Sequence, residues 1–194
     1  TLNYRNKIQQ YIDQTGTVEN NGFLAATGIM TIYLAIFDTD MYGSIPYTEA
    51  AHYDDKGILT PKYEKVEDLY DLWIEELNNY ITMLQAGDLV SFKGQDAAYG
   101  CDWKKWARFA NSLKLKIAAR LYNNEPAKAM QLVEEAASNK AGLMTSTDDD
   151  FLFCKATVKS SGSDDYVYGT GNGILSPSAS RSVMNFMLGA KDPR

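Results

Sequence analysis

The sequence predicts a mainly α-helical protein, built from paired helices that are joined by long irregular loops. Apolar residues recur three or four positions apart through most of the segment 64–142, which is the period of one face of an α-helix. The segments 41–62 and 145–180 lose that period and collect glycine, proline or serine, so we expect loops there. A short strand at Phe151-Leu152-Phe153 is the one candidate for a small β-hairpin.

Length and composition indicate one globular domain over residues 1–194. The chain is 45% hydrophobic and 23% charged, which argues against disorder. Nineteen Lys and Arg against 25 Asp and Glu give a net charge of −6, the wrong sign for a protein that binds nucleic acid through its phosphates. Cys101 and Cys154 lack zinc-site spacing and could form one bridge or none.

The clearest predicted helix runs from Glu64 to Gln85. One face is acidic, and Gly87 follows as a helix terminator. The expected inward positions are Val66, Leu69, Tyr70, Trp73, Leu77, Tyr80, Ile81 and Leu84.

A helical hairpin follows between Asp102 and Gly142. Asp102 is a good N-cap, and Pro126 ends one helix while fitting the first turn of the next, which runs to about Lys140. The first helix should bury Trp106, Phe109, Ala110, Leu113, Ile117, Ala118 and Leu121. The second should bury Ala129, Leu132, Val133, Ala136 and Ala137.

The ends of the chain are less regular. We expect a short helix around residues 2–12, a break at 20–22, and a buried helix over Phe23–Phe37 that is too short for the roughly 20 residues needed to cross a bilayer. A last short helix is expected at Ser182–Leu188.

Residues that could support catalysis or bind a metal ion are sparse. The single histidine, His52, cannot build a metal cluster or a catalytic triad with any partner visible in the sequence. The acidic runs 148–150 and 164–165 lack the calcium-loop pattern and are expected to be solvated. A cationic stripe of Lys104, Arg108, Lys116 and Arg120 should be the wet side of its helix, paired with the acidic face of the 64–85 helix. No enzyme activity, metal or cofactor is predicted.

Aromatic residues outside the helical faces are candidates for a ligand site. A tyrosine ring can stack on the C–H face of a sugar while polar neighbours bond its hydroxyls. The predicted ligand-binding residues are Tyr42, Tyr47, Tyr53, Tyr99, Tyr166, Tyr168 and Asn172.

Three segments, in order along the chain, resemble those of a known family. Residues 40–50 read DMYGSIPYTEA, residues 60–70 contain TPKY followed by an acidic helix start, and residues 104–115 read KKWARFANSLKL. They are similar to the D-x-Y-G-x-I-P-Y-x-E-A, P-K-Y and K-W-x-K-F-A-N-S-L-K-L-R segments of the SusD/RagB family of Bacteroidetes, with Lys116 where an arginine is common. The closing Asp192-Pro193-Arg194 also resembles the family.

The resemblance implies tetratricopeptide-like helix pairs whose loops form the ligand site. Family members are lipid-anchored at the outer-membrane surface and capture oligosaccharides for a SusC-like TonB-dependent transporter. The motif residues themselves should be structural. This chain begins without the anchoring cysteine and is shorter than a full member, so we expect it to be an internal portion of a longer protein.

Two alternatives to glycan capture stay open at this point. One is a helical scaffold that binds a protein partner through its acidic and basic helix faces. The other is capture of peptide nutrients by the same kind of uptake system. A glycoside hydrolase would need a pair of acids in apolar surroundings, and the sequence shows no such pair.

Overall fold

The computed structural model describes residues 1–151 and 181–190. Thr1–Leu152 and Phe153–Arg194 are two separate compact units. In the second unit the described element is helix α8 (Arg181–Gly189), which extends the predicted 182–188 helix by one residue at each end. The prediction of one domain over residues 1–194 stays a prediction.

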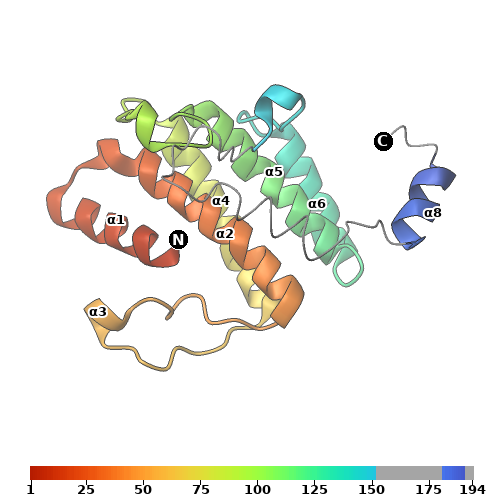
Figure 1. Ribbon diagram of the computed structural model, residues 1–194, viewed down its shortest axis with the longest axis horizontal. Helices are drawn as coiled ribbons and strands as arrows, with labels where there is room; N and C mark the ends of the chain where they lie inside the picture. Colours follow the sequence, from red (N-terminus) through yellow and green to blue (C-terminus); the bar gives the residue numbers. More distant parts are fainter. Residues whose placement is uncertain (152–180, 191–194) are drawn as a thin grey trace, which may run out of the picture. The chain divides into compact units, whose positions relative to one another are not determined.

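The first unit is a stack of helices that follow one another in space as they do in sequence. Figure 1 shows α2 beside α1, and α4, α5 and α6 following in turn; each long helix contacts the next. This confirms the mainly α fold class. The long helices are α1 (Leu2–Thr15), α2 (Asn21–Tyr42), α4 (Val66–Gln85), α5 (Trp103–Leu121) and α6 (Pro126–Ser138). The short elements are η1 (Val18–Asn20), α3 (Tyr53–Lys56), η2 (Lys93–Gln95) and η3 (Thr147–Asp149).

Helices α4, α5 and α6 bury the faces that their periodicity predicts. Seven of the eight expected inward residues of α4 are core residues, and so are all seven of α5. Asp102 caps α5 by accepting hydrogen bonds from the backbone N–H groups of Lys104 and Lys105. In α6 the prediction was wrong for Val133 and Ala137, which are exposed, because the helix packs mainly against α5 and so needs a narrower apolar stripe.

Helix α2 is the central element and is longer than its sequence suggested. Together with η1 it is long and apolar enough to cross a membrane by length and composition, but 56% of its most apolar window is buried inside the protein. Its burial is made possible by Gly28, where a Cβ atom would lie 2.2 Å from Cζ of Tyr80. A helical glycine thus lets the Tyr80 ring of α4 pack directly on the α2 backbone.

Polar residues of the KKWARFANSLKL segment join α5 to its neighbours. Asn111 is fully buried, and its amide donates to the carbonyl oxygens of Ala136 and Gly142, each at 2.8 Å. Lys114 is also buried, with its ammonium group 2.9 Å from Oδ1 of Asn78 on α4, and desolvation lowers its pKa. These bonds engage the amide nitrogen of Asn111 and the ammonium group of Lys114, which would otherwise be costly to bury, so this motif has the structural role predicted for it.

Among the described residues there is no β-strand and hence no hairpin. The nearest feature is a single antiparallel bridge between Ile45 and Glu64. Phe151 does not extend a sheet: its ring stacks on Phe109 at 4.7 Å between centroids, while the rest of the predicted strand lies outside the described residues.

Candidate functional site

The long loop between α2 and α4 is ordered by carboxylates. Helix α2 continues to Tyr42, two residues into the predicted loop, and ends at Gly43, whose φ of +73° suits glycine. The Glu64 carboxylate then accepts hydrogen bonds from the backbone N–H groups of Tyr47 and Thr48 and from the Thr48 hydroxyl, at 2.7 to 3.0 Å. The Lys62 backbone N–H donates to Glu49. Hydrogen bonds to the Glu49 and Glu64 carboxylates therefore join the DMYGSIPYTEA segment to the end of the loop. We call these contacts the clamp.

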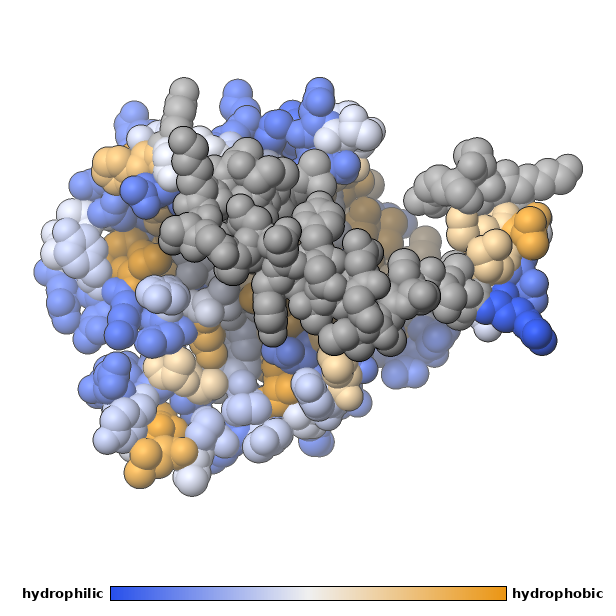
Figure 2. Space-filling model, in the orientation of Figure 1, coloured by the Kyte–Doolittle hydropathy of each residue, from blue (hydrophilic) through white to orange (hydrophobic). Residues whose placement is uncertain are grey.

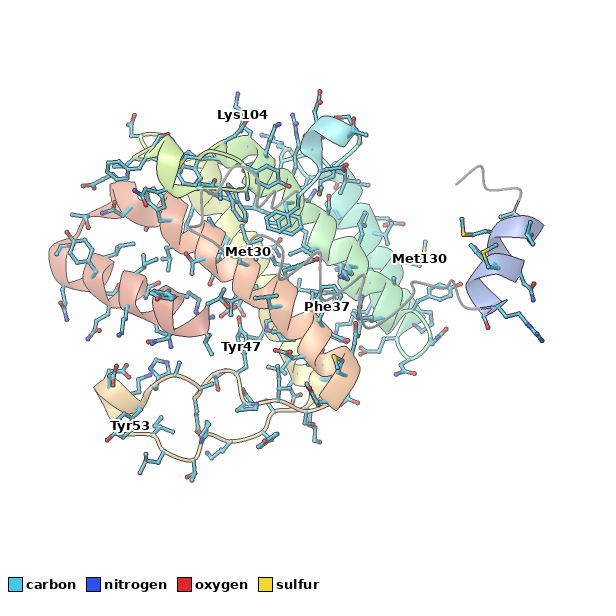
Figure 3. The ribbon with its side chains drawn as sticks, viewed as in Figure 1. Met30, Phe37, Tyr47, Tyr53, Lys104 and Met130 are labelled. Carbon is cyan, nitrogen blue, oxygen red and sulfur yellow. The ribbon has the colours of Figure 1, made fainter. Side chains whose placement is uncertain are left out.

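Tyr47 fastens this loop to the helices. Its ring is 2% exposed and packs edge-on against Trp73 of α4. Its hydroxyl donates to the Glu76 carboxylate at 2.8 Å and accepts from the Arg5 guanidinium at 3.0 Å. Burial raises the pKa of Tyr47 well above its ordinary value and also raises the pKa of Glu76. Figure 3 shows Tyr47 between the loop and the helices above it.

The four predicted ligand residues that the structure describes do not line a common pocket. Tyr47 is a core residue, so the prediction that its ring stacks on a sugar was wrong. Although Tyr47 belongs to the loop, its side chain is buried beside the Arg5–Glu76 ion pair. Tyr99 is half-buried: its ring packs on Trp106 and its hydroxyl donates to the backbone oxygen of Asp149, and its role in binding stays a prediction.

Two predicted residues remain available to a ligand. Tyr42 is 72% exposed at the end of α2, and Tyr53 is 61% exposed on α3, at the outer end of the loop in Figure 3. Their role in binding stays a prediction. Tyr166, Tyr168 and Asn172 lie outside the described residues.

The cationic stripe of α5 does not pair with the acidic face of α4, so that prediction was wrong. Arg108 pairs with Asp149 at 2.7 Å, and Arg120 pairs with Asp40 of α2. The ammonium group of Lys116 lies 3.9 Å from the ring centroid of Phe37. These partners come from α2 and η3, because those elements, and not the acidic face of α4, lie beside the polar side of α5.

The acids and the histidine form no catalytic or metal cluster in the described part of the chain. No group of three or more His, Cys, Asp or Glu side chains there could hold a metal ion. Asp149 is buried and not solvated as predicted, because its carboxylate pairs with Arg108, and this hydrogen bond lowers its pKa. His52 contacts Asp55 through Nδ1 at 2.8 Å and Asn6 through Nε2. This arrangement holds α3 beside α1.

An open aromatic groove offers a different candidate binding site. It has a volume of about 640 Å³ and lies where α1, the start of α2 and η2 meet. Tyr4, Tyr11 and Phe92 line it with between 54% and 71% of their surface exposed. We call this set, together with Phe23, the aromatic groove.

The groove has a rigid floor and a polar edge. Phe92 stacks on Phe23 at 5.8 Å, and Phe23 in turn packs edge-on against Trp103 at 5.4 Å between centroids, so the exposed ring is backed by the core. Asn20 and Gln95 add amide groups at the edge. Flat apolar rings beside amide donors and acceptors suit the faces and hydroxyls of a sugar ring. The groove lining also includes Lys7 and contains no Asp, Glu, His or Cys side chain.

One feature of the sequence points to this groove, namely the spacing of two tyrosines in the first helix. Tyr4 and Tyr11 are seven residues apart, so both lie on the same face of α1. Phe92 lies more than 80 residues later in the chain, and only folding brings it to them.

The first unit is thus a helical scaffold with an exposed aromatic groove. The particular family follows from its sequence: residues 2–194 match a SusD-like family described as "Starch-binding associating with outer membrane". The chain belongs to this SusD-like family, as the three motif segments predicted. No curated protein matches the chain.

Solved structures agree with this assignment. A SusD/RagB family protein from Bacteroides thetaiotaomicron is 27% identical with a TM-score of 0.74, and the match covers 100% of this chain and 39% of that one. A chitin-binding protein is 28% identical with a TM-score of 0.72, over 96% of this chain and 38% of that one. A SusD homologue from Bacteroides uniformis is 29% identical with a TM-score of 0.68, over 77% and 30%. The chain thus spans less than two fifths of the length of these relatives.

Proposed function

We infer that this chain takes part in capturing oligosaccharides at the outer-membrane surface, without cleaving them. The observation that carries the proposal is the aromatic groove: three exposed rings beside amide groups, on a floor fixed by Phe23 and Trp103. The family description and the chitin-binding neighbour support the same ligand class. Affinity should be modest, because sugar hydroxyls exchange bonds with water for similar bonds with protein.

The relatives are more than twice as long as this chain. The whole protein would pass its sugar to a SusC-like TonB-dependent transporter. A lipid anchor at its N-terminus would hold it on the cell surface. Both statements rest on the family. A tagged full-length protein should co-purify with such a transporter from outer membranes and should label intact cells.

The alternative, a scaffold that binds protein through its charged helix faces, has less support. Arg108, Lys116 and Arg120 are engaged by Asp149, Phe37 and Asp40 inside the chain, so the basic face offers a partner little free charge.

The test is calorimetric titration of this chain with starch and chitin oligosaccharides. One aromatic contact contributes on the order of 0.5 to 1.5 kcal/mol, so Tyr11→Ala and Phe92→Ala should each weaken binding by about three- to ten-fold. Tyr63→Ala removes an exposed tyrosine that does not line the groove, so it is the control and should change nothing.

Tyr53→Ala examines the loop in the same assay. Loss of affinity in Tyr53→Ala alone would move the site to α3, whereas no change in any groove variant would refute the groove. Chromatography of each bound sugar checks for turnover, and a cleaved product would contradict the non-enzymatic proposal.

A further inference from the structure

A second cleft lies at the end of the stack where α4 ends, α5 begins and α6 ends. Its volume is about 570 Å³, within the range of small-molecule sites. Part of the lining is apolar: Leu84 and Ala107 are buried, Leu89 and the half-buried Trp103 complete the apolar walls, and Gln85 adds one amide group. This cleft shares only Trp103 with the floor behind the aromatic groove, so it is a separate site.

The rim of this cleft is positive, although the chain as a whole carries a net charge of −6. Lys104, Arg108 and Lys140 line it, against one carboxylate, that of Asp88. Arg108 is held by Asp149, but Lys104 and Lys140 are exposed and take part in no ion pair within residues 1–151 and 181–190. Figure 3 places Lys104 at the start of α5, at this end of the stack.

Charge and lining together select the ligand. Two uncommitted ammonium groups favour an anion, and aliphatic walls favour an apolar body over a sugar, which would need more amide and hydroxyl partners for its own hydroxyls. We propose that this cleft binds an aliphatic carboxylate, with the apolar body between Leu84, Leu89 and Ala107 and the carboxylate at Lys104 and Lys140. The C-terminal residue of a peptide has this chemistry, and so does a short fatty acid.

The cleft is separate from the proposed glycan groove, so this inference does not depend on glycan capture. In Figure 2 the apolar patches on the visible face of the first unit are islands among hydrophilic residues. A cleft that combines apolar walls with a cationic rim within one small volume orients a ligand as well as binding it.

The experiment is an NMR titration of this chain that follows the backbone amide resonances of Leu89 and Ala141, which line the cleft and not the aromatic groove. The probe is acetyl-Leu-Leu with a free carboxylate, and the same peptide with a C-terminal amide is its neutral match. We expect saturable shifts with the acid and at least ten-fold weaker binding of the amide. Octanoate, in a parallel arm, distinguishes a fatty acid from a peptide end, and glucuronate distinguishes an acidic sugar.

Charge-removing variants test the rim. Lys104→Met and Lys140→Met keep an apolar stem. Each should weaken binding of the peptide with a free carboxylate by about three- to ten-fold, since each removes one charge-assisted contact. Lys65→Met is the control: it is exposed and lies outside the cleft. The spectrum of each variant reports whether it is folded. Equal binding of acid and amide, tighter binding of glucuronate, equal losses in all three variants, or no shift at any concentration would each overturn the proposal. Loss of sugar binding in Phe92→Ala would not affect it.

Discussion

The α4–α5–α6 segment and the loop of residues 43–65 are both ordered, but by different physical means. The helices bury apolar stripes that are continuous along each element. The loop has little apolar surface to bury, and three glutamates hold it instead: Glu49 and Glu64 bond the loop to itself, and Glu76 receives the hydroxyl of Tyr47. A change in the helices should therefore destabilise the whole first unit, whereas a change in the clamp should open the loop locally.

The largest expected effect is in the helices. Trp106 is buried among Tyr99, Phe109 and Phe151, and its indole N–H donates to Asp96 at 2.7 Å. Trp106→Ala should lower the free energy of unfolding by about 3 to 5 kcal/mol, as large-to-small changes of buried aromatics do. Urea denaturation followed by circular dichroism measures this. Tyr122→Ala, at an exposed position just after α5, should stay within about 0.5 kcal/mol of the parent. Similar stability of the two variants would mean that the aromatic cluster does not hold the helices together.

The contact between α2 and α4 should be nearly as sensitive. Gly28→Ala would place a methyl group inside the Tyr80 ring and force the two helices apart, costing about 3 kcal/mol of unfolding free energy. Gly94→Ala is the matched control, because a Cβ there meets nothing within 4 Å and its φ is not positive. An unchanged melting temperature in Gly28→Ala would show that the helices are further apart than the structure has them.

Alkaline pH should weaken the contact of α4 with α1 and α2, where Tyr80 is buried. Burial, followed by the charge of Glu76, raises the pKa of Tyr80 to about 12, whereas an unfolded tyrosine titrates near 10. The native state then holds its proton more tightly than the unfolded state. The associated stability is complete below about pH 10 and is lost as pH rises through about 12, a change of about 2 to 3 kcal/mol.

Denaturant titrations at pH 9, 10.5 and 12 measure this loss. In Tyr80→Phe the dependence on pH should be shallower, although Tyr47, whose pKa is also raised, will retain part of it. A parallel decline in the parent and in Tyr80→Phe would assign the alkaline loss to other groups.

The smallest effect is expected in the clamp. Glu64→Gln removes a charged acceptor from three hydrogen bonds and should cost about 1 to 2 kcal/mol. The decisive readout is hydrogen exchange: the Tyr47 and Thr48 amides should exchange faster while the amides of α5 do not. Glu134→Gln, an exposed change on α6, is the control. Uniformly faster exchange throughout the first unit would mean that loop and helices open together and would break the comparison.

Much of the fold could be predicted from the sequence because local signals agreed with burial. The periodic faces of α4 and α5 are core, Asp102 caps α5, and Pro126 begins α6. The sequence also predicts the long loop and the last helix, with boundary errors of one to three residues. The three family motifs are sufficient to indicate the SusD-like family.

The candidate site was much harder to predict than the fold. Tyr47 and Tyr99 looked like surface tyrosines because their neighbours in sequence are polar and irregular, yet each meets its partners from distant elements: Arg5 and Glu76 in one case, Phe151 in the other. The partners of the α5 cations were misassigned for the same reason. Charge pattern predicts that a cation will find an acid, but not which acid lies opposite.

By itself the sequence determined which segments are helical, which faces they bury and to which family the chain belongs. These properties are set by residues close together along the chain, where a period or a cap can be recognised directly. Only the tertiary structure decided that Tyr47 is a core residue, that Tyr4 and Tyr11 share a groove with Phe92, and that Lys104 and Lys140 share a cleft. A binding surface is assembled from residues far apart in sequence, and their proximity depends on how the helices pack and not on any local pattern.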